Sequence, residues 1–193
     1  MKKLILLITA TLFVLPLAAQ FKAKMFFTGM GKEHVFTVYA SDANYRYEFN
    51  EDGQAGVIIA KTGSSEIVIL MPAQKMAMKA TAENPMSMGS DPVKVYEHYL
   101  DSGIMKEEGK EMVNGVQCTK STLWNKENST QKMYTAWLSD QFKFPVKLIN
   151  HMDGSGEGAI MELKDIEAWT PDTQSFKIPP GYQVMDMPQM NTY

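Results

Sequence analysis

Apolar and polar residues alternate with a period of two along most of this chain after residue 20. Tyr45, Tyr47 and Phe49, for example, are separated by polar residues. Such alternation is typical of a β-strand with one buried face, because successive side chains point to opposite sides of a sheet. Turn residues divide the runs, and Asn114-Gly115 between two of them is a strong hairpin signal. The pattern therefore predicts a meander of antiparallel strands.

The runs that we expect to form strands are short and evenly spaced. Two stretches, residues 57–59 and 67–70, are continuously apolar, so we expect that part of the sheet to be covered on both faces. A last extended segment is expected at residues 175–184, followed by a loose tail. The full set of expected strands is 21–28, 33–40, 44–49, 56–61, 66–71, 74–79, 104–113, 116–124, 131–138, 144–150 and 159–169.

One segment has helical rather than strand periodicity. Apolar residues recur at helical spacing between Val93 and Leu100, and Asp91-Pro92 supplies an N-cap followed by proline at the first helical position. We therefore expect one short amphipathic helix there. The elements together predict a mainly β fold with minor α: a strongly curved antiparallel sheet, or unclosed barrel, with one or two covering helices.

The N-terminal residues have the composition of a targeting segment. After a positive start, residues 4–15 are almost entirely apolar, and Ala18-Ala19 supplies small residues where a signal peptidase would cut. The apolar run is too short for a membrane span, which needs about 20 apolar residues. We expect residues 1–20 to be a secretory signal peptide and residues 21–193 to form a single domain.

Composition excludes several classes of function. The chain has 193 residues with 19 Lys+Arg against 22 Asp+Glu, so it lacks the basic excess of a nucleic-acid binder. Its single cysteine, Cys118, excludes an internal disulfide and sites built from several thiolates. Because Cys118 lies far from the expected cleavage site, we expect a soluble, exported, periplasmic protein without a lipid anchor.

Groups that would support catalysis are scattered. His34, His98 and His151 are widely separated and form no paired ligand motif. The Ser155 loop lies between strand signals rather than at the strand-to-helix elbow of hydrolases. Cys118 follows Val116 in an expected strand, where we interpret it as a small buried hydrophobic residue rather than a reactive thiol. We therefore expect no enzyme activity, no catalytic residue, no cofactor and no metal site.

Methionine is the conspicuous excess, at 16 residues. Flexible, polarisable thioethers suit an adaptable apolar wall, and we favour that interpretation. Thioethers are also soft ligands for Cu(I), and two Met-x-Met pairs have a suitable spacing, so copper binding stays open as an alternative. The methionines concerned are Met71, Met76, Met78, Met86 and Met88 in one stretch, and Met185, Met187 and Met190 near the end.

Two further residues are candidates for ligand contact. Arg46 lies between two tyrosines on an alternating strand, so its side chain points away from their face. It is either a solvated residue on the outer face or a polar anchor for a ligand headgroup. Trp137 is an aromatic candidate for the wall of a cavity.

The order of several short motifs resembles the LolA/LolB-like superfamily of periplasmic proteins, in an uncharacterised branch made of domains of unknown function. The resemblance implies an unclosed barrel whose mouth is covered by helices around an apolar cavity, which in characterised branches accommodates acyl chains. The motifs are Tyr45-Arg46-Tyr47-Glu48, Ile69-Leu70-Met71-Pro72, Lys75-Met76, Gly115-Val116-Gln117-Cys118-Thr119, Trp137-Leu138-Ser139, Phe144-Pro145-Val146-Lys147 and Phe176-Lys177-Ile178-Pro179-Pro180-Gly181-Tyr182.

We therefore expect a carrier or sensor of the cell envelope that binds a lipid, an acyl chain or another apolar ligand in a barrel cavity. The candidate cavity residues are Arg46, Met71, Met76, Met78, Met86, Met88 and Trp137. One alternative is a non-catalytic envelope module that binds a protein partner. The other is a copper-binding protein that uses Met86, Met88, Met185 and Met187.

Overall fold

The computed structural model describes residues 20–29, 32–51, 53–81, 91–152 and 158–187. Most of the expected signal peptide therefore lies outside the described residues, as do Met86 and Met88. No helix in the described ranges is both long enough and apolar enough to cross a membrane.

Within these ranges, twelve strands and two short helical segments follow one another along the chain. Their bounds agree closely with the expected runs, because each strand has its own alternation and is flanked by turn residues. The strands are β1 (Gln20–Gly29), β2 (Lys32–Ser41), β3 (Asn44–Glu51), β4 (Gln54–Lys61), β5 (Glu66–Met71), β6 (Met76–Thr81), β7 (Gly103–Val113), β8 (Val116–Asn125), β9 (Lys132–Ser139), β10 (Pro145–Asn150), β11 (Ala159–Ala168) and β12 (Gln183–Asp186). The helical segments are η1 (Pro72–Gln74) and α2 (Pro92–Leu100).

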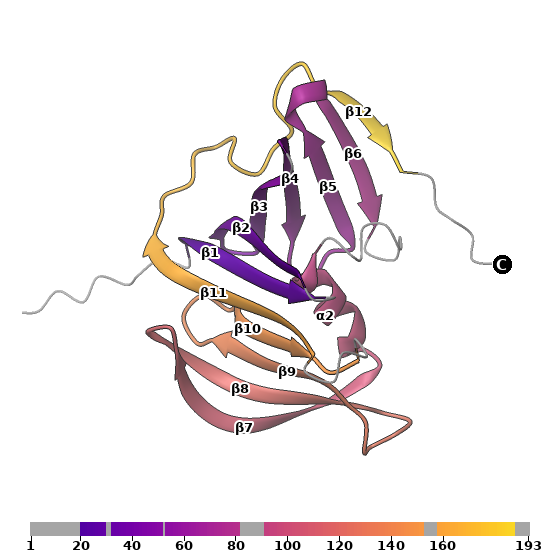
Figure 1. Cartoon of the computed structure of the whole chain (residues 1–193), viewed down its shortest axis with the longest axis vertical. Coiled ribbons are helices and arrows are strands. Elements are labelled where there is room, and N and C mark those ends of the chain that lie inside the picture. Colours follow the sequence, from indigo (N-terminus) through magenta and orange to yellow (C-terminus); the bar gives the residue numbers. More distant parts are fainter. Residues whose placement is uncertain (1–19, 30–31, 52, 82–90, 153–157, 188–193) are drawn as a thin grey trace, which may run out of the picture.

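All twelve strands belong to one sheet, in the order β12-β6-β5-β4-β3-β2-β1-β11-β10-β9-β8-β7. The sheet is open, with β12 and β7 as its edges, and neighbouring strands are antiparallel except for the parallel pair β12 and β6. The predicted mainly β fold, with an unclosed sheet and a covering helix, is confirmed. The sheet is less curved than expected, since it does not curl strongly (Figure 1).

Local signals in the sequence account for the turn and the helix. Asn114 and Gly115 adopt φ angles of 48° and 81°, as a tight hairpin between β7 and β8 requires. Asp91 has an extended backbone, and its side chain accepts hydrogen bonds from the amides of Val93 and Lys94. It is therefore the N-cap that the sequence predicted for α2.

One face of the sheet, which we call the helix face, packs against α2 around the larger hydrophobic core. Tyr45 and Tyr47 on β3 are fully buried there, together with Phe21 on β1. Tyr96 of α2 packs edge-on against Tyr134 of β9, with ring centroids 5.5 Å apart. The helix therefore connects the β3 part of the sheet to the β9 part, as Figure 1 shows.

The other face, which we call the strap face, carries a second, smaller core. Residues 169–182, here named the strap, run from β11 to β12 and cover it (Figure 1). This coverage confirms that the continuously apolar strands β4 and β5 are buried on both faces. The buried residues of this core are Val57, Ile59, Leu70 and Ala77, with Val68, Phe176, Ile178 and Tyr182 packed against them.

The end of the chain differs from the expected extended segment at 175–184 followed by a loose tail. Residues 175–182 contain turns and form no strand, and the last strand is β12 (Gln183–Asp186). Met185 and Asp186 belong to β12, which pairs in parallel with Met78 and Lys79 of β6. The strap carries the chain across the sheet and delivers β12 to the free edge of β6. A strand of four residues has too few positions to show an alternation of its own, so no local pattern indicated this pairing.

Candidate functional site

Three methionines of the helix face lie at one end of the sheet, next to η1. Met71 and Met76 are cross-strand partners, and Met78 is the partner of Ile69. Ile69 pairs in turn with Ile58 of β4, and Ile58 pairs with Tyr47 of β3. The methionines therefore share a face with Tyr47, which belongs to the core around α2. The predicted shared face of Met76 and Met78 is confirmed, and Met71 lies on it too.

These methionines differ from others of the same face in their exposure. Met71, Met76 and Met78 are partly exposed. Met25 and Met161, in contrast, are only 0% and 1% exposed and belong to the main core. The three side chains at the η1 end therefore remain accessible on a surface that continues the core.

Two phenylalanines extend this surface over β2 and β3. Phe36 and Phe49 are partly buried and pack edge-to-face, with ring centroids 6.0 Å apart. A Cβ added at Gly56 would lie 2.1 Å from Cζ of Phe49, so the ring lies directly over this glycine. Gly56 thus allows Phe49 to lie flat across β4 and widen the apolar surface.

Met185 joins the same surface from the edge strand. It is the parallel register partner of Met78 and is 38% exposed. The sequence pattern groups Met185 with Met187, close to it in the chain, whereas the sheet places it beside Met78. We call Met71, Met76, Met78 and Met185 the methionine corner.

The first turn of α2 is fixed to the sheet by a buried carboxylate. Asp91 is 0% exposed and accepts hydrogen bonds from the hydroxyls of Tyr45 (2.8 Å) and Tyr47 (3.2 Å), in addition to the two helix amides. Burial raises the pKa of Asp91 to about 6, and the hydrogen bonds from Tyr45 and the Lys94 amide oppose this shift. Sequence reasoning found the cap but missed its tyrosine partners, because they are distant in the chain.

Lys94 holds the same end of the helix. Its side chain is 1% exposed, and its ammonium donates hydrogen bonds to the carbonyl of Lys61 (2.6 Å) and to Glu97 (2.5 Å). The ammonium also lies over the ring of Tyr45, 5.7 Å from the centroid. The buried charge is therefore paired, and this cluster holds α2 in place.

Arg46 lies on the strap face, opposite to the methionine corner. Its Nη1 donates a 2.9 Å hydrogen bond to the carbonyl of Ser175 in the strap, and its other amino group pairs with Glu48. The guanidinium lies over Tyr39, which packs against Trp169 at the start of the strap. Arg46 thus points away from the two tyrosines as predicted, and it contacts the strap.

Trp137 is also separated from the methionines. It lies on β9, is the partner of Lys147, and is a buried member of the larger core, with 8% of its surface exposed. Its indole donates a 2.8 Å hydrogen bond to Glu111 and lies between the ammonium groups of Lys120 and Lys147. The structure brings together Met71, Met76 and Met78 of the candidate set, and places Arg46 and Trp137 elsewhere.

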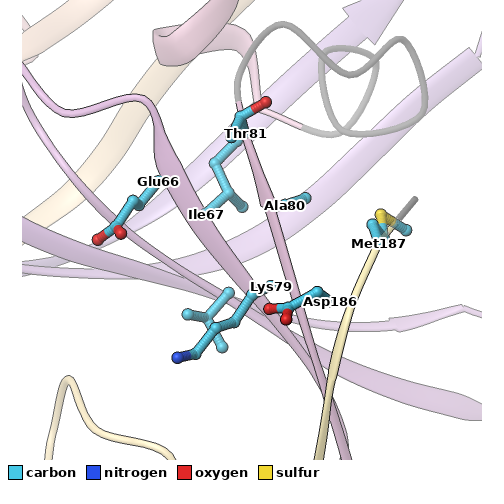
Figure 2. Close-up of a pocket in the computed structure, with 8 residues that line it drawn as sticks. Glu66, Ile67, Lys79, Ala80, Thr81, Asp186 and Met187 are labelled. Carbon is cyan, nitrogen blue, oxygen red and sulfur yellow. The ribbon is translucent and has the colours of Figure 1, made fainter. Parts of the chain in front are cut away.

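A recess of ≈ 480 Å³ opens at the other end of β5, β6 and β12. Figure 2 shows Glu66, Lys79 and Asp186 at its wall, together with Ile67 and Met187. Three charged groups in a small recess make it a poor site for an acyl chain, because each would lose water on binding. The apolar surface at the η1 end is therefore the better candidate for an apolar ligand.

The cysteine thiol and the potential metal ligands show no arrangement for catalysis within the described residues. Cys118 is fully buried, and burial raises the pKa of its thiol to about 11, which disfavours the nucleophilic thiolate. Within the described ranges, no three His, Cys, Asp or Glu side chains converge on a point where they could hold a metal ion.

Comparison with known proteins gives one partial family match and several solved structures of similar fold. A family model described as a domain of unknown function (DUF4412) matches residues 124–182, which is less than half of the chain. The search of curated proteins gave no match. An uncharacterised conserved protein from Thermus thermophilus has a similar structure, with 12% identity, a TM-score of 0.56, and coverage of 89% of this chain and 93% of that one.

MucB is a second structure of similar fold, with 13% identity and a TM-score of 0.52. The match covers 86% of this chain and 59% of MucB, so this chain spans little more than half of that protein. The MucA/MucB complex from Pseudomonas aeruginosa matches with 14% identity and a TM-score of 0.50, covering 86% of this chain and 58% of that one. At sequence identities this low, the similarity shows a shared fold and nothing about function.

A LolA superfamily protein from Nitrosomonas europaea is also among the matches, with 10% identity, a TM-score of 0.44, and coverage of 84% of this chain and 91% of that one. The chain shares its open-sheet fold with the Thermus thermophilus protein and with MucB, and residues 124–182, which include its later strands and the strap, match a domain of unknown function.

Proposed function

We propose that the protein is an exported, non-catalytic carrier or sensor that binds an apolar ligand, such as the acyl chain of a lipid, on its helix face. One observation carries this proposal: five apolar side chains from four strands form a partly exposed surface that continues the main core. They are Phe36, Phe49, Met71, Met76 and Met78. An acyl chain laid on this surface would remove apolar area from water.

The composition of the surface suits a flexible ligand. Methionine side chains have three rotatable bonds and adapt to chains of different shape, while the two phenyl rings supply rigid contact area. The surface borders the buried cluster that holds α2, because the ring centroid of Phe36 lies 6.2 Å from that of Tyr47, whose hydroxyl donates to Asp91. The proposed ligand site contains neither Arg46, which contacts the strap, nor Trp137.

The remaining parts of the proposal follow from the sequence and the fold. Residues 1–20 have the pattern of a signal peptide, and we assign residues 21–193 to one exported domain without a lipid anchor. The motifs that resemble the LolA/LolB-like superfamily support a role in the cell envelope rather than an enzyme activity.

Binding of the fluorescent apolar probe N-phenyl-1-naphthylamine to the mature protein tests this function. We expect saturable binding at one site, and a loss of affinity of at least about tenfold in Met78→Lys, which places a charge in the apolar surface. Met112→Lys is the matched control, because Met112 is 62% exposed on the distant edge strand β7. Equal affinity of Met78→Lys and the wild type would contradict the proposed site.

A protein-interaction module of the envelope is the second candidate, and the edge strand β12 favours it. Val184 on this strand is 48% exposed, and one side of β12 is unpaired within the described sheet. Such an edge accepts an extended segment of a partner. A photo-crosslinking residue at position 184 tests this in the native envelope: one specific adduct would support the module, and its absence would favour the carrier.

A further inference from the structure

We propose that the methionine corner is a binding site for a soft monovalent cation of the Cu(I) class, with the thioether sulfurs of Met71, Met76, Met78 and Met185 as ligands. The site goes beyond the proposed apolar-ligand function. It also differs from the Met-x-Met pairs visible in the sequence, because it draws its ligands from three strands, β5, β6 and β12.

The register of the sheet brings the four side chains together. Met71 lies opposite Met76, and Met185 lies beside Met78, so the members of each pair are register partners on neighbouring strands. Side chains in such positions have Cβ atoms about 5 Å apart, and residues two apart on one strand are about 7 Å apart. A methionine side chain is long enough for four sulfurs to converge across these distances.

The exposure of the four side chains leaves the sulfurs free to move. Met71, Met76 and Met78 are partly exposed and Met185 is 38% exposed, and none of them belongs to the buried part of either core. Their rotamers can therefore change when a cation binds without opening a cavity in the core.

The surroundings of the corner select a soft cation. Glu66 is on the strap side of β5, since Val68 and Leu70 of the same parity pack into the strap core. Asp186 is next to Met185 in the strand and so points to the opposite face. With these carboxylates directed away, the corner offers thioethers, which prefer Cu(I), and not the oxygen ligands that Mg²⁺ or Ca²⁺ needs.

Substitution by leucine removes the proposed ligand atoms. Leucine has nearly the volume of methionine and keeps the surface apolar, but it has no sulfur. The fourfold variant Met71→Leu, Met76→Leu, Met78→Leu and Met185→Leu should therefore lose Cu(I). Met105→Leu with Met112→Leu is the control, since both residues are exposed (43% and 62%) at the opposite edge of the sheet.

Anaerobic competition for Cu(I) against the chelator bicinchoninate is the measurement. We expect the wild type and the control to withdraw one Cu(I) per chain, and the fourfold variant to bind at least about a hundredfold more weakly. X-ray absorption of the loaded protein should show a shell of sulfur neighbours. A wild type that takes no Cu(I) from the chelator, a fourfold variant that binds like the wild type, or a shell of nitrogen and oxygen would each overturn the proposal.

Two further measurements keep the outcome interpretable. Circular dichroism first establishes that the fourfold variant is folded, and the single variants Met78→Leu and Met185→Leu replace it if it is not. The naphthylamine probe is titrated in parallel. Failure of the wild type to bind the probe would overturn the apolar-ligand function, whereas the Cu(I) competition tests the metal site independently of the probe.

Discussion

The hydroxyl of Tyr45 on β3 donates a 2.8 Å hydrogen bond to the buried carboxylate of Asp91, which caps α2. The two residues are 46 positions apart, so this bond attaches the helix to a strand that lies far from it in the sequence. It makes the position of α2 over the sheet depend on one buried cluster.

Removing the Tyr45 hydroxyl should loosen that cluster. We expect Tyr45→Phe to lower the free energy of unfolding by about 2 kcal/mol, because a hydrogen bond to a charged, buried acceptor is lost while the ring still packs. Urea denaturation measures this change. Tyr182→Phe in the strap serves as the control and should stay within about 0.5 kcal/mol of the wild type. Equal losses in the two variants would contradict the role of the Tyr45–Asp91 hydrogen bond in holding α2.

Stability should depend on pH through Asp91. Its pKa is about 6 in the folded protein against 3.8 normally, so the folded state binds the proton more tightly than the unfolded state does. The resulting stabilisation is complete below about pH 4 and is lost as the pH rises through 6. It amounts to about 3 kcal/mol, at about 1.36 kcal/mol per pKa unit.

Comparison with Asp91→Asn isolates this effect, because asparagine does not titrate. Between about pH 3 and pH 7 the wild type should lose about 3 kcal/mol relative to Asp91→Asn, measured by urea denaturation at each pH. A difference between the two proteins that stays constant with pH, or that favours the wild type as pH rises, would show that the Asp91 carboxyl is not the group responsible.

Gly56 should be required for the placement of Phe49. Gly56→Ala puts a methyl group where the Phe49 ring lies, so we expect a loss of about 1–3 kcal/mol in stability and weaker binding of the naphthylamine probe. The double variant Gly56→Ala with Phe49→Leu removes the clash. Its cost should be smaller than the sum of the two single changes, and additive costs would count against direct contact.

The strap should be held mainly by its apolar side chains. Phe176→Ala removes a ring that packs on the core of the strap face, and we expect a loss of about 2–3 kcal/mol and faster trypsin cleavage at Lys177. Gln174→Ala, an exposed position in the same segment, should change neither stability nor cleavage. Unchanged proteolysis of Phe176→Ala would mean that the strap does not depend on this contact.

The sequence by itself determined the elements whose signals are local. Alternation placed Met76 and Met78 on one face, Asp91 before a proline marked the helix start, and Asn114-Gly115 marked the hairpin. Each of these rests on interactions between residues close in the chain, so a single sequence is enough to reveal them.

Only the tertiary structure decided which residues from distant parts of the chain lie next to each other. It placed Met185 beside Met78 through a parallel pairing, set Arg46 under the strap, and gave Asp91 its two tyrosine partners. Alternation tells which residues of a strand share a face, but both faces of a sheet have the same period. Which face meets the helix, and which the strap, depends on contacts between distant segments, and those form only when the chain is folded.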